Sequence, residues 1–339
     1  MLQRGSNATP RFQVFSTCPP SHDADPLAYL ERVREVARWS EEAGCEGILV
    51  YTDNRLVDPW LVATAIVQAT ERLAPLVALQ PAYMHPYAAA KMVASLAFMY
   101  GRSVHINLVA GGFKLDLEAL GDSTPHDERY ERATAYADIM QRLLGGDAPV
   151  FADGPYYRLQ GARLQPPVPA GLRPGWMISG SSPAGRAAAQ RLGAVAIAYP
   201  QPAQQEDPVG DHPSGVRLGL VARAERTEAW ALARARFPRT RSGQVMHGLA
   251  TKASDSHWHR QLSQGDEGAD ESAGTYWLGP FRHYQTFCPY LVGSYDEVAA
   301  DLAAYLRLGH RTLVLDIPPS REELVHVRHV LDMAEGASA

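Results

Sequence analysis

The sequence is poor in cysteine and has no long uninterrupted apolar run, and each shortage excludes a class of protein. Its 339 residues include Cys18, Cys45 and Cys288, an odd number without the spacing of a zinc site. We therefore expect a reducing compartment, with neither a disulfide framework nor a metal site. Apolar runs end well before the ~18 residues that a membrane span needs, and the first residues lack a signal-peptide core. These shortages predict a cytoplasmic protein that does not bind membranes.

Charge of one sign is also lacking, as are several short catalytic motifs. The net charge is −5 and the pI about 6.2, with acidic and basic residues mixed along the chain, so we expect no nucleic-acid partner. No GxGxxG follows the first predicted strand, and neither GxSxG nor HExxH occurs. These absences argue against a dinucleotide-binding Rossmann domain and against hydrolases, and they favour other small-molecule chemistry.

What the chain does have is a regular alternation of predicted strands and helices. Eight segments are predicted as strands: residues 11–16, 47–51, 75–80, 103–109, 176–179, 194–198, 216–222 and 312–316. This alternation, without a composition break, predicts a single (β/α)₈ TIM barrel over residues 1–339, with a doubly wound sheet as the alternative. Residues 239–289 interrupt the rhythm as a long polar insertion, and we expect it to close over the active site as a lid.

Helix ends are well signalled in several places. Residues 86–100 are predicted as one helix, and another starts at Asp58 as N-cap. The last two helices each begin with the pattern of a capping box, Ser294 with Glu297 and Ser320 with Glu323.

A phosphate site is predicted where the strand at residues 176–179 turns into a helix. Gly180, Ser181 and Ser182 precede Pro183, so Ser182 suits the N-cap and the first N–H groups of the helix face outward beside two hydroxyls. A helix N-terminus of this kind binds anions, although an ordinary capped helix would have the same sequence.

Two further segments carry side chains suited to a bound heterocycle and its phosphate. Asn107 ends a predicted strand just before two glycines, which fits a flat ring with donors and acceptors; a plain turn is the alternative. His126 and Tyr130 lie four residues apart on one helix face and could reach phosphate oxygens, or could serve only capping and packing.

Taken in order, these segments resemble the bacterial luciferase-like flavin monooxygenases, close to the alkanesulfonate monooxygenase branch. The likeness runs nearly end to end, and its main segments are residues 104–112 (VHINLVAGG), 126–131 (HDERYE) and 179–182 (SGSS).

The resemblance implies FMN that arrives reduced from a separate flavin reductase and reacts with O₂. It assigns the phosphate to Gly180, Ser181, Ser182, His126 and Tyr130, and the polar edge of the ring to Asn107, with Asp53 nearby. It also favours a homodimer or homotetramer and a small or carrier-tethered organic substrate.

Departures from the alkanesulfonate pattern bear on the substrate. Leu56, Gly219 and Ile317 stand where that branch carries a cysteine, a histidine and a tyrosine. A pocket that loses polar groups binds a desolvated sulfonate poorly, so we expect a different substrate.

Arg217 is retained and is the best catalytic or substrate-orienting candidate, with a structural ion pair as the alternative. His22 and Gln80, which follow the first and third predicted strands, are weaker candidates for proton transfer and polar positioning. Two other functions stay open: a deazaflavin-dependent oxidoreductase of the same fold, and a barrel that binds flavin without catalysis.

Overall fold

The computed structural model describes residues 11–112, 114–180, 182–253, 257–263 and 274–337. Among these, eight strands close into a ring in which every neighbouring pair is parallel. The ring consists of β1 (Gln13–Thr17), β2 (Gly47–Val50), β3 (Ala74–Leu79), β4 (His105–Leu108), β7 (Trp176–Ser179), β8 (Val195–Ala198), β9 (Ser214–Arg223) and β12 (Thr312–Leu315). The predicted TIM barrel is therefore confirmed.

The barrel strands are apolar because both of their faces are covered. All residues of β2, β3, β9 and β12 are buried, as expected for parallel strands with side chains inside and helices outside. Inside the ring, one cluster of side chains fills the centre: Phe15, Leu49, Leu76, Ala78, Met177, Ile197 and Val314. The interior is thus a packed core, and a site can form only toward its ends.

Strand β9 is longer than its neighbours, and its two halves pair with different strands. Its first residues pair with β8 and β12, whereas residues 219–223 pair in parallel with β11 (Tyr290–Ser294). This register sets Gly219 opposite Tyr290. Strand β11, which was not predicted, also pairs with the short antiparallel β10 (Tyr276–Trp277).

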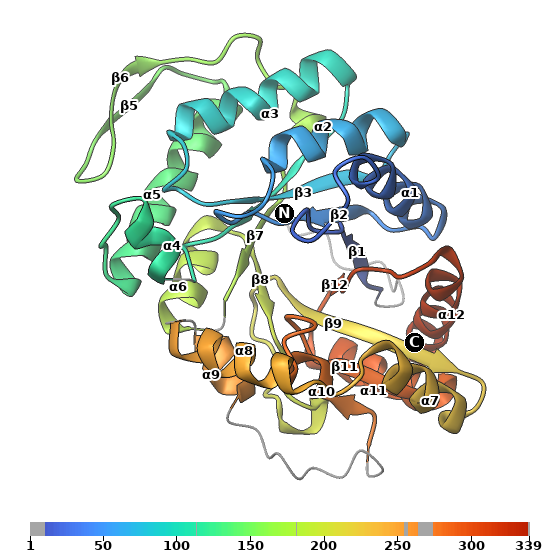
Figure 1. The fold of residues 1–339 in the computed structure, drawn as a ribbon. Coiled ribbons are helices and arrows are strands. Elements are labelled where there is room, and N and C mark those ends of the chain that lie inside the picture. The colour runs from blue at the N-terminus through green and yellow to red at the C-terminus, as the bar shows by residue number, and fades with distance from the viewer. Residues whose placement is uncertain (1–10, 113, 181, 254–256, 264–273, 338–339) are drawn as a thin grey trace.

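Helices surround the strands, as Figure 1 shows. Helix α3 (Pro86–Tyr100) and strand β7 have the predicted bounds, and the Asp58 carboxylate caps α2 (Pro59–Ala69) by accepting the N–H of Trp60 at 2.8 Å. The remaining helices around the barrel are α1 (Tyr29–Glu42), α4 (Lys114–Ala119), α5 (His126–Gly145), α6 (Pro183–Leu192), α7 (Arg226–Arg236), α11 (Tyr295–Leu308) and α12 (Arg321–Gly336).

The predicted capping boxes have different outcomes. Ser294 and Glu297 form one at the start of α11. At α12 the Ser320 hydroxyl accepts the N–H of Glu323, but the Glu323 carboxylate binds two arginines instead of completing the box. That half of the prediction is wrong because the side chain has charged partners nearby.

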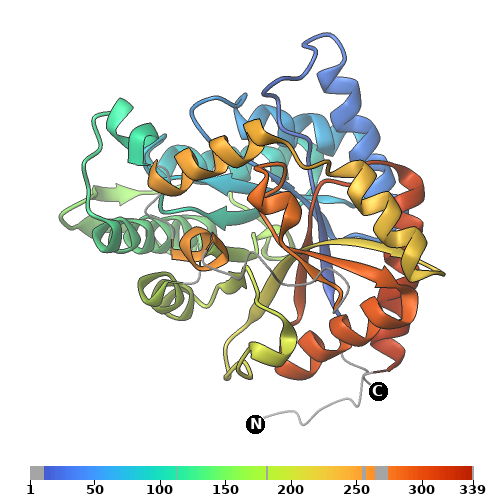
Figure 2. The same ribbon diagram turned by 60° about the horizontal axis from the view of Figure 1, so that its bottom comes forward.

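The predicted insertion contains helices of its own, α8 (Arg241–Ala253), α9 (His257–Ser263) and α10 (Gly279–Arg282). They pack on one another and, drawn in orange, lie together on one side of the strands (Figure 1 and Figure 2). A separate hairpin, β5 (Val150–Asp153) and β6 (Arg158–Ala162), extends beyond α5 and was not predicted. No helix in the described ranges is both long and apolar enough to cross a membrane.

Candidate active site at the carboxyl ends of the barrel strands

The turn between β7 and α6 has the geometry of a capped helix start. The Ser182 hydroxyl accepts the N–H of Gly185 at 3.1 Å, with Ser182 itself extended at φ −68° and ψ 153°. Pro183 occupies the first helical position and has no N–H group. Among the described residues of this turn, the N–H of Ala184 is therefore left to meet an anion. Ser181, predicted to bind the phosphate, lies outside the described residues.

Tyr130 of α5 packs against this turn, and its closeness explains why two positions of the turn are glycines. A Cβ atom at Gly180, whose φ is +154°, would lie 2.7 Å from the Tyr130 hydroxyl oxygen, and one at Gly185 would lie 3.2 Å from it. The edge of the His126 ring packs on Tyr130, with centroids 5.2 Å apart, and the His126 Nδ1 lies 2.7 Å from the Asp127 carboxylate. The structure thus brings Gly180, Ser182, His126 and Tyr130 together.

Two of the other predicted residues, Asn107 and Arg217, line one small pocket in the barrel. Asn107, Ser179 and Arg217 supply its polar lining, among apolar side chains of the central cluster. The Ser179 hydroxyl donates to Asn107 Oδ1 at 3.0 Å. Because Ser179 is the last residue of β7, this hydrogen bond connects the cavity to the helix start beyond it.

Arg217 is a deeply buried cation, with 3% of its surface exposed. It donates a hydrogen bond to the Tyr51 hydroxyl, and its guanidinium lies 5.1 Å from the Tyr51 ring centre and 5.9 Å from that of Tyr199. In the part of the chain that the structure describes, no carboxylate lies within 4.0 Å of Arg217, and its Nε has no hydrogen-bond partner. Among the described residues Arg217 therefore takes part in no ion pair, and its functional role stays a prediction.

Electrostatics keep Arg217 charged. Burial alone would lower the pKa of Arg217, but the nearby phenols of Tyr51 and Tyr199, the Cys288 thiol and the Asp316 carboxylate outweigh it and raise that pKa. Burial likewise raises the pKa of the Tyr51 hydroxyl and of the Cys288 thiol, so both stay protonated at neutral pH. Cys288 is hence a neutral neighbour and not a reactive thiolate.

A second polar pair, not foreseen from the sequence, lies beside Arg217. The Tyr290 hydroxyl donates to Asp316 Oδ2 at 2.9 Å, and burial followed by the Asp316 charge raises the pKa of Tyr290. The Tyr290 ring fills the space above Gly219, where an added Cβ would lie 2.2 Å from ring atoms. The expected loss of polar groups at Gly219 is therefore offset by a side chain from the neighbouring strand β11.

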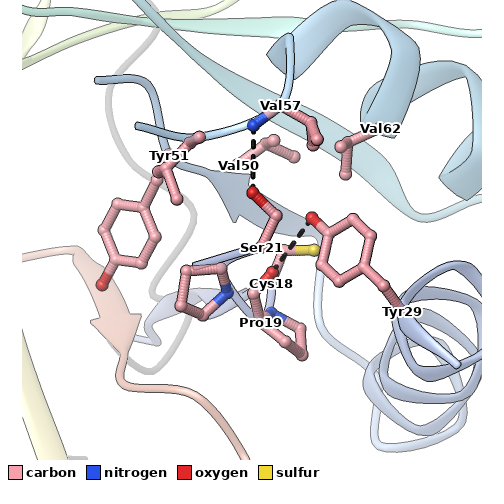
Figure 3. Close-up of a pocket in the computed structure, with 10 residues that line it drawn as sticks. Cys18, Pro19, Ser21, Tyr29, Val50, Tyr51, Val57 and Val62 are labelled. Atoms are coloured by element: carbon pink, nitrogen blue, oxygen red, sulfur yellow. Dashed lines mark hydrogen bonds between the residues drawn. The ribbon is translucent and has the colours of Figure 1, made fainter. Parts of the chain in front are cut away.

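Aromatic residues of the insertion contact this end of the barrel. The Trp258 ring of α9 stacks on Tyr199, with centroids 3.8 Å apart and an interplanar angle of 10°. Phe287 packs edge-on against Tyr51 at 6.4 Å. In Figure 3 the Tyr51 ring points away from Ser21 and Tyr29, which line the same small pocket as Tyr51.

The other predicted residues are more dispersed. Gln80 is buried at the end of β3, and Asp53 lies in the loop after β2, where it accepts the N–H of Arg55 at 2.7 Å. The His22 side chain is 53% exposed and faces Asp23 at 4.0 Å. In the described ranges no contact joins His22 to the cavity, so its proposed proton transfer has no geometric support.

The residues that sequence reasoning missed share one signal. Tyr199 and Asp316 each directly follow a barrel strand, the position at which TIM barrels carry functional groups. Cys288 and Tyr290 were missed because the strand that carries Tyr290 was not predicted.

Comparison with known proteins agrees with this geometry. A family model described as Luciferase-like monooxygenase matches residues 11–312. The 4-(gamma-L-glutamylamino)butanoyl-(BtrI acyl-carrier protein) monooxygenase BtrO of Niallia circulans is 30% identical over 310 residues, which cover 89% of this chain and 91% of that protein.

Solved structures show the same fold at lower identity. Riboflavin lyase RcaE, with modified FMN and riboflavin, has a TM-score of 0.72 at 19% identity and covers 97% of this chain and 92% of its own. An F420-dependent secondary alcohol dehydrogenase has a TM-score of 0.64 at 15% identity, covering 96% and 99%. The predicted enzyme class is confirmed, but the narrower expectation of the alkanesulfonate branch is not, since BtrO, a curated relative, is named for a different substrate.

Proposed function

Because the chain belongs to the Luciferase-like monooxygenase family, we propose that it binds FMN in reduced form and oxygenates an acyl group tethered to a carrier protein. The single observation that carries the proposal is the capped start of α6, packed against Tyr130 at the mouth of the barrel.

The residues at that helix start fit the phosphate of FMN. The N–H of Ala184 and the positive end of the α6 dipole suit a dianion, and the tyrosine hydroxyl and the His126 ring lie on the adjacent helix. Gly180 keeps the approach open because any side chain there would meet Tyr130. No metal is needed to hold a phosphate in such a place.

The barrel cavity fits the remaining parts of the reaction. Asn107 can hydrogen-bond the polar edge of a flavin ring while Ser179 fixes the orientation of its amide. Reduced flavin, supplied by a separate reductase, would activate O₂ for transfer of one oxygen atom. Arg217 then orients the oxygen atoms of the substrate by charge, in a place from which water is excluded.

Residues 239–289 are proposed as the lid of this site. The support is the stacking of Trp258 on Tyr199 and the contact of Phe287 with Tyr51, which cover the side chains nearest to Arg217. A cover of this kind keeps water from reactive oxygen species until the substrate is consumed.

The proposal of a carrier-tethered substrate comes from the relative. BtrO is named for an acyl group on an acyl-carrier protein, and the alignment spans nine-tenths of both chains. The reductase and a dimeric or tetrameric assembly are proposed partners of the same scheme.

The test is a fluorescence titration with FMN, together with oxygen uptake in the presence of NADH. We expect oxygen uptake only when a flavin reductase is added, and a loss of FMN affinity of about tenfold in Tyr130→Phe, as one charged hydrogen bond disappears. Tyr100→Phe is the matched control, because Tyr100 bonds Gln68 on the exposed surface of α3. Preference for the deazaflavin F420, or NADH turnover by the chain alone, would overturn the proposal.

A further inference from the structure

Two opposite charges stand near each other at the carboxyl end of the barrel without forming ion pairs. Arg217 has no acidic partner within 4.0 Å among the described residues, and Asp316 has no Lys, Arg or His nitrogen within that distance in the same ranges. They are close enough that the Asp316 charge raises the pKa of Arg217. The Asp316 charge therefore acts on Arg217 without forming an ion pair with it.

Both side chains belong to the inner face of the barrel. Arg217 lines the cavity beside Val314 of β12, its partner in the strand register. Side chains alternate along a strand, so after Val314 the next inward position is Asp316, one residue beyond the end of β12. Asp316 is only half-buried, so a ligand that enters from the mouth can approach this residue.

Tyr290 fixes the position of the Asp316 carboxylate. Its hydroxyl binds one carboxylate oxygen, Oδ2, and no hydrogen bond from the described residues reaches Oδ1. The ring cannot shift toward β9 without meeting Gly219, and its far side packs against Phe237 at 4.9 Å between centroids. Tyr290 is thus a positioning residue for Asp316.

A buried cation without a counter-ion is costly, and the phenols and the thiol around Arg217 compensate only in part. A ligand that carries a carboxylate for Arg217 and an ammonium for Asp316 would satisfy both groups at once. The Arg217 Nε and the Asp316 Oδ1 are the atoms left for these bonds.

We propose that Arg217 and Asp316 form a clamp for a zwitterionic α-amino acid group at the end of the substrate's acyl chain. This inference rests on the proposed function and narrows its substrate class. A γ-glutamyl group, with its α-ammonium and α-carboxylate, has the required pair of charges.

The test uses three small amides that differ by one charge each. The first is the N-methylamide of 4-(γ-L-glutamylamino)butanoic acid, in which the γ-glutamyl end carries both charges and the amide end carries none. The glutaryl analogue lacks the ammonium, and the 4-aminobutanoyl analogue lacks the α-carboxylate. Dissociation constants are measured by calorimetry with and without oxidised FMN, so that binding is read without turnover.

We expect the zwitterionic amide to bind at least about tenfold more tightly than either analogue, the effect of one charge-assisted hydrogen bond. Asp316→Asn abolishes the preference over the glutaryl analogue, and Arg217→Gln abolishes that over the 4-aminobutanoyl analogue. Tyr290→Phe reduces the first preference only. Asp153→Asn, whose side chain is 83% exposed on the hairpin, keeps wild-type constants.

Equal binding of all three amides, or none by the first at millimolar concentration, overturns the clamp. Should Arg217→Gln fail to fold, Asp316→Asn and Tyr290→Phe decide alone. A chain that binds FMN and takes up oxygen with a reductase, yet does not distinguish the amides, refutes only the clamp. One that distinguishes them but binds no FMN refutes the proposed function.

Discussion

Replacing Gly219 with alanine tests the packing on which the polar pair beside Arg217 depends. An added Cβ would lie 2.2 Å from two Tyr290 ring atoms and 2.4 Å from a third. Ordinary carbon contacts need about 3.5–4.0 Å, so the ring must retreat by more than an ångström. It is fully buried between β9 and Phe237, and its hydroxyl is tied to Asp316.

The magnitude follows from overpacking of a tight core. Gly219→Ala should lower the free energy of unfolding by about 1–3 kcal/mol. In a Tyr290→Ala background the same change meets no ring and should be neutral or slightly stabilising, because alanine restricts the unfolded chain. The double-mutant cycle should therefore give a coupling of about 2 kcal/mol.

Unfolding in urea followed by circular dichroism measures the four free energies. Gly171→Ala is the control, since a Cβ at Gly171 meets nothing within 4 Å. Were Gly219→Ala as stable as this control, or were the cycle additive, the reasoning about Tyr290 would be refuted.

Four other changes probe the rest of the molecule. Gly180→Ala should weaken FMN binding at least about tenfold in a fluorescence titration, because the new Cβ would lie 2.7 Å from the Tyr130 hydroxyl oxygen at the proposed phosphate site. Unchanged affinity would contradict a phosphate site at this turn. Trp258→Ala should raise NADH-dependent oxygen uptake without product, since the proposed lid loses its stacking contact; tight coupling would argue against a lid. Glu323→Gln should lower the free energy of unfolding by about 3–5 kcal/mol, because two arginines lose their shared buried carboxylate; an unchanged Tm would contradict this. Burial lowers the pKa of His259 and of His310 to about 4, so the unfolded chain binds more protons than the folded chain below pH 6.5. The free energy of unfolding should therefore fall as the pH drops from 6.5 toward 4, by about 2 kcal/mol for each histidine at pH 5. Urea midpoints that stay level over this pH range would refute the assignment.

The periodic part of the fold was predictable from the sequence. All eight predicted strands occur, since a buried parallel strand is a short apolar run and each run stands between clear helix signals. Strand β4 is shorter than predicted, at His105–Leu108, although the N–H of Val109 just beyond it still donates to the Leu79 carbonyl of β3 at 2.9 Å.

Elements that depend on distant partners were not predictable in the same way. Strand β11 is five residues long and follows the long insertion, so its identity depends on pairing with residues 219–223 of β9. Glu323 has the spacing of a capping box, but arginines from β9 and α7 take its carboxylate. Neither partner can be recognised from local sequence.

In the candidate site too, features set by adjacent residues were predictable and features set by distant residues were not. The α6 start was predictable because its cap and proline are adjacent in sequence, and the structure adds Tyr130 to it through space. Near Arg217, one-by-one comparison of positions suggested a pocket with fewer polar groups at Gly219. The volume is instead filled by Tyr290, 71 residues later, which brings Asp316 with it.

This exchange changes how substitutions in such barrels translate into specificity. When a large side chain on β9 is replaced by glycine, the space either stays open or is filled by the facing residue of β11. The first outcome removes a polar group from the pocket, and the second supplies one from another strand. Here the smallest residue on β9 admits a phenol that presents a carboxylate opposite a buried guanidinium. Under the proposed clamp, position 219 would specify a substrate only in combination with position 290, and relatives with glycine at the first but no tyrosine at the second should not discriminate amino acid groups.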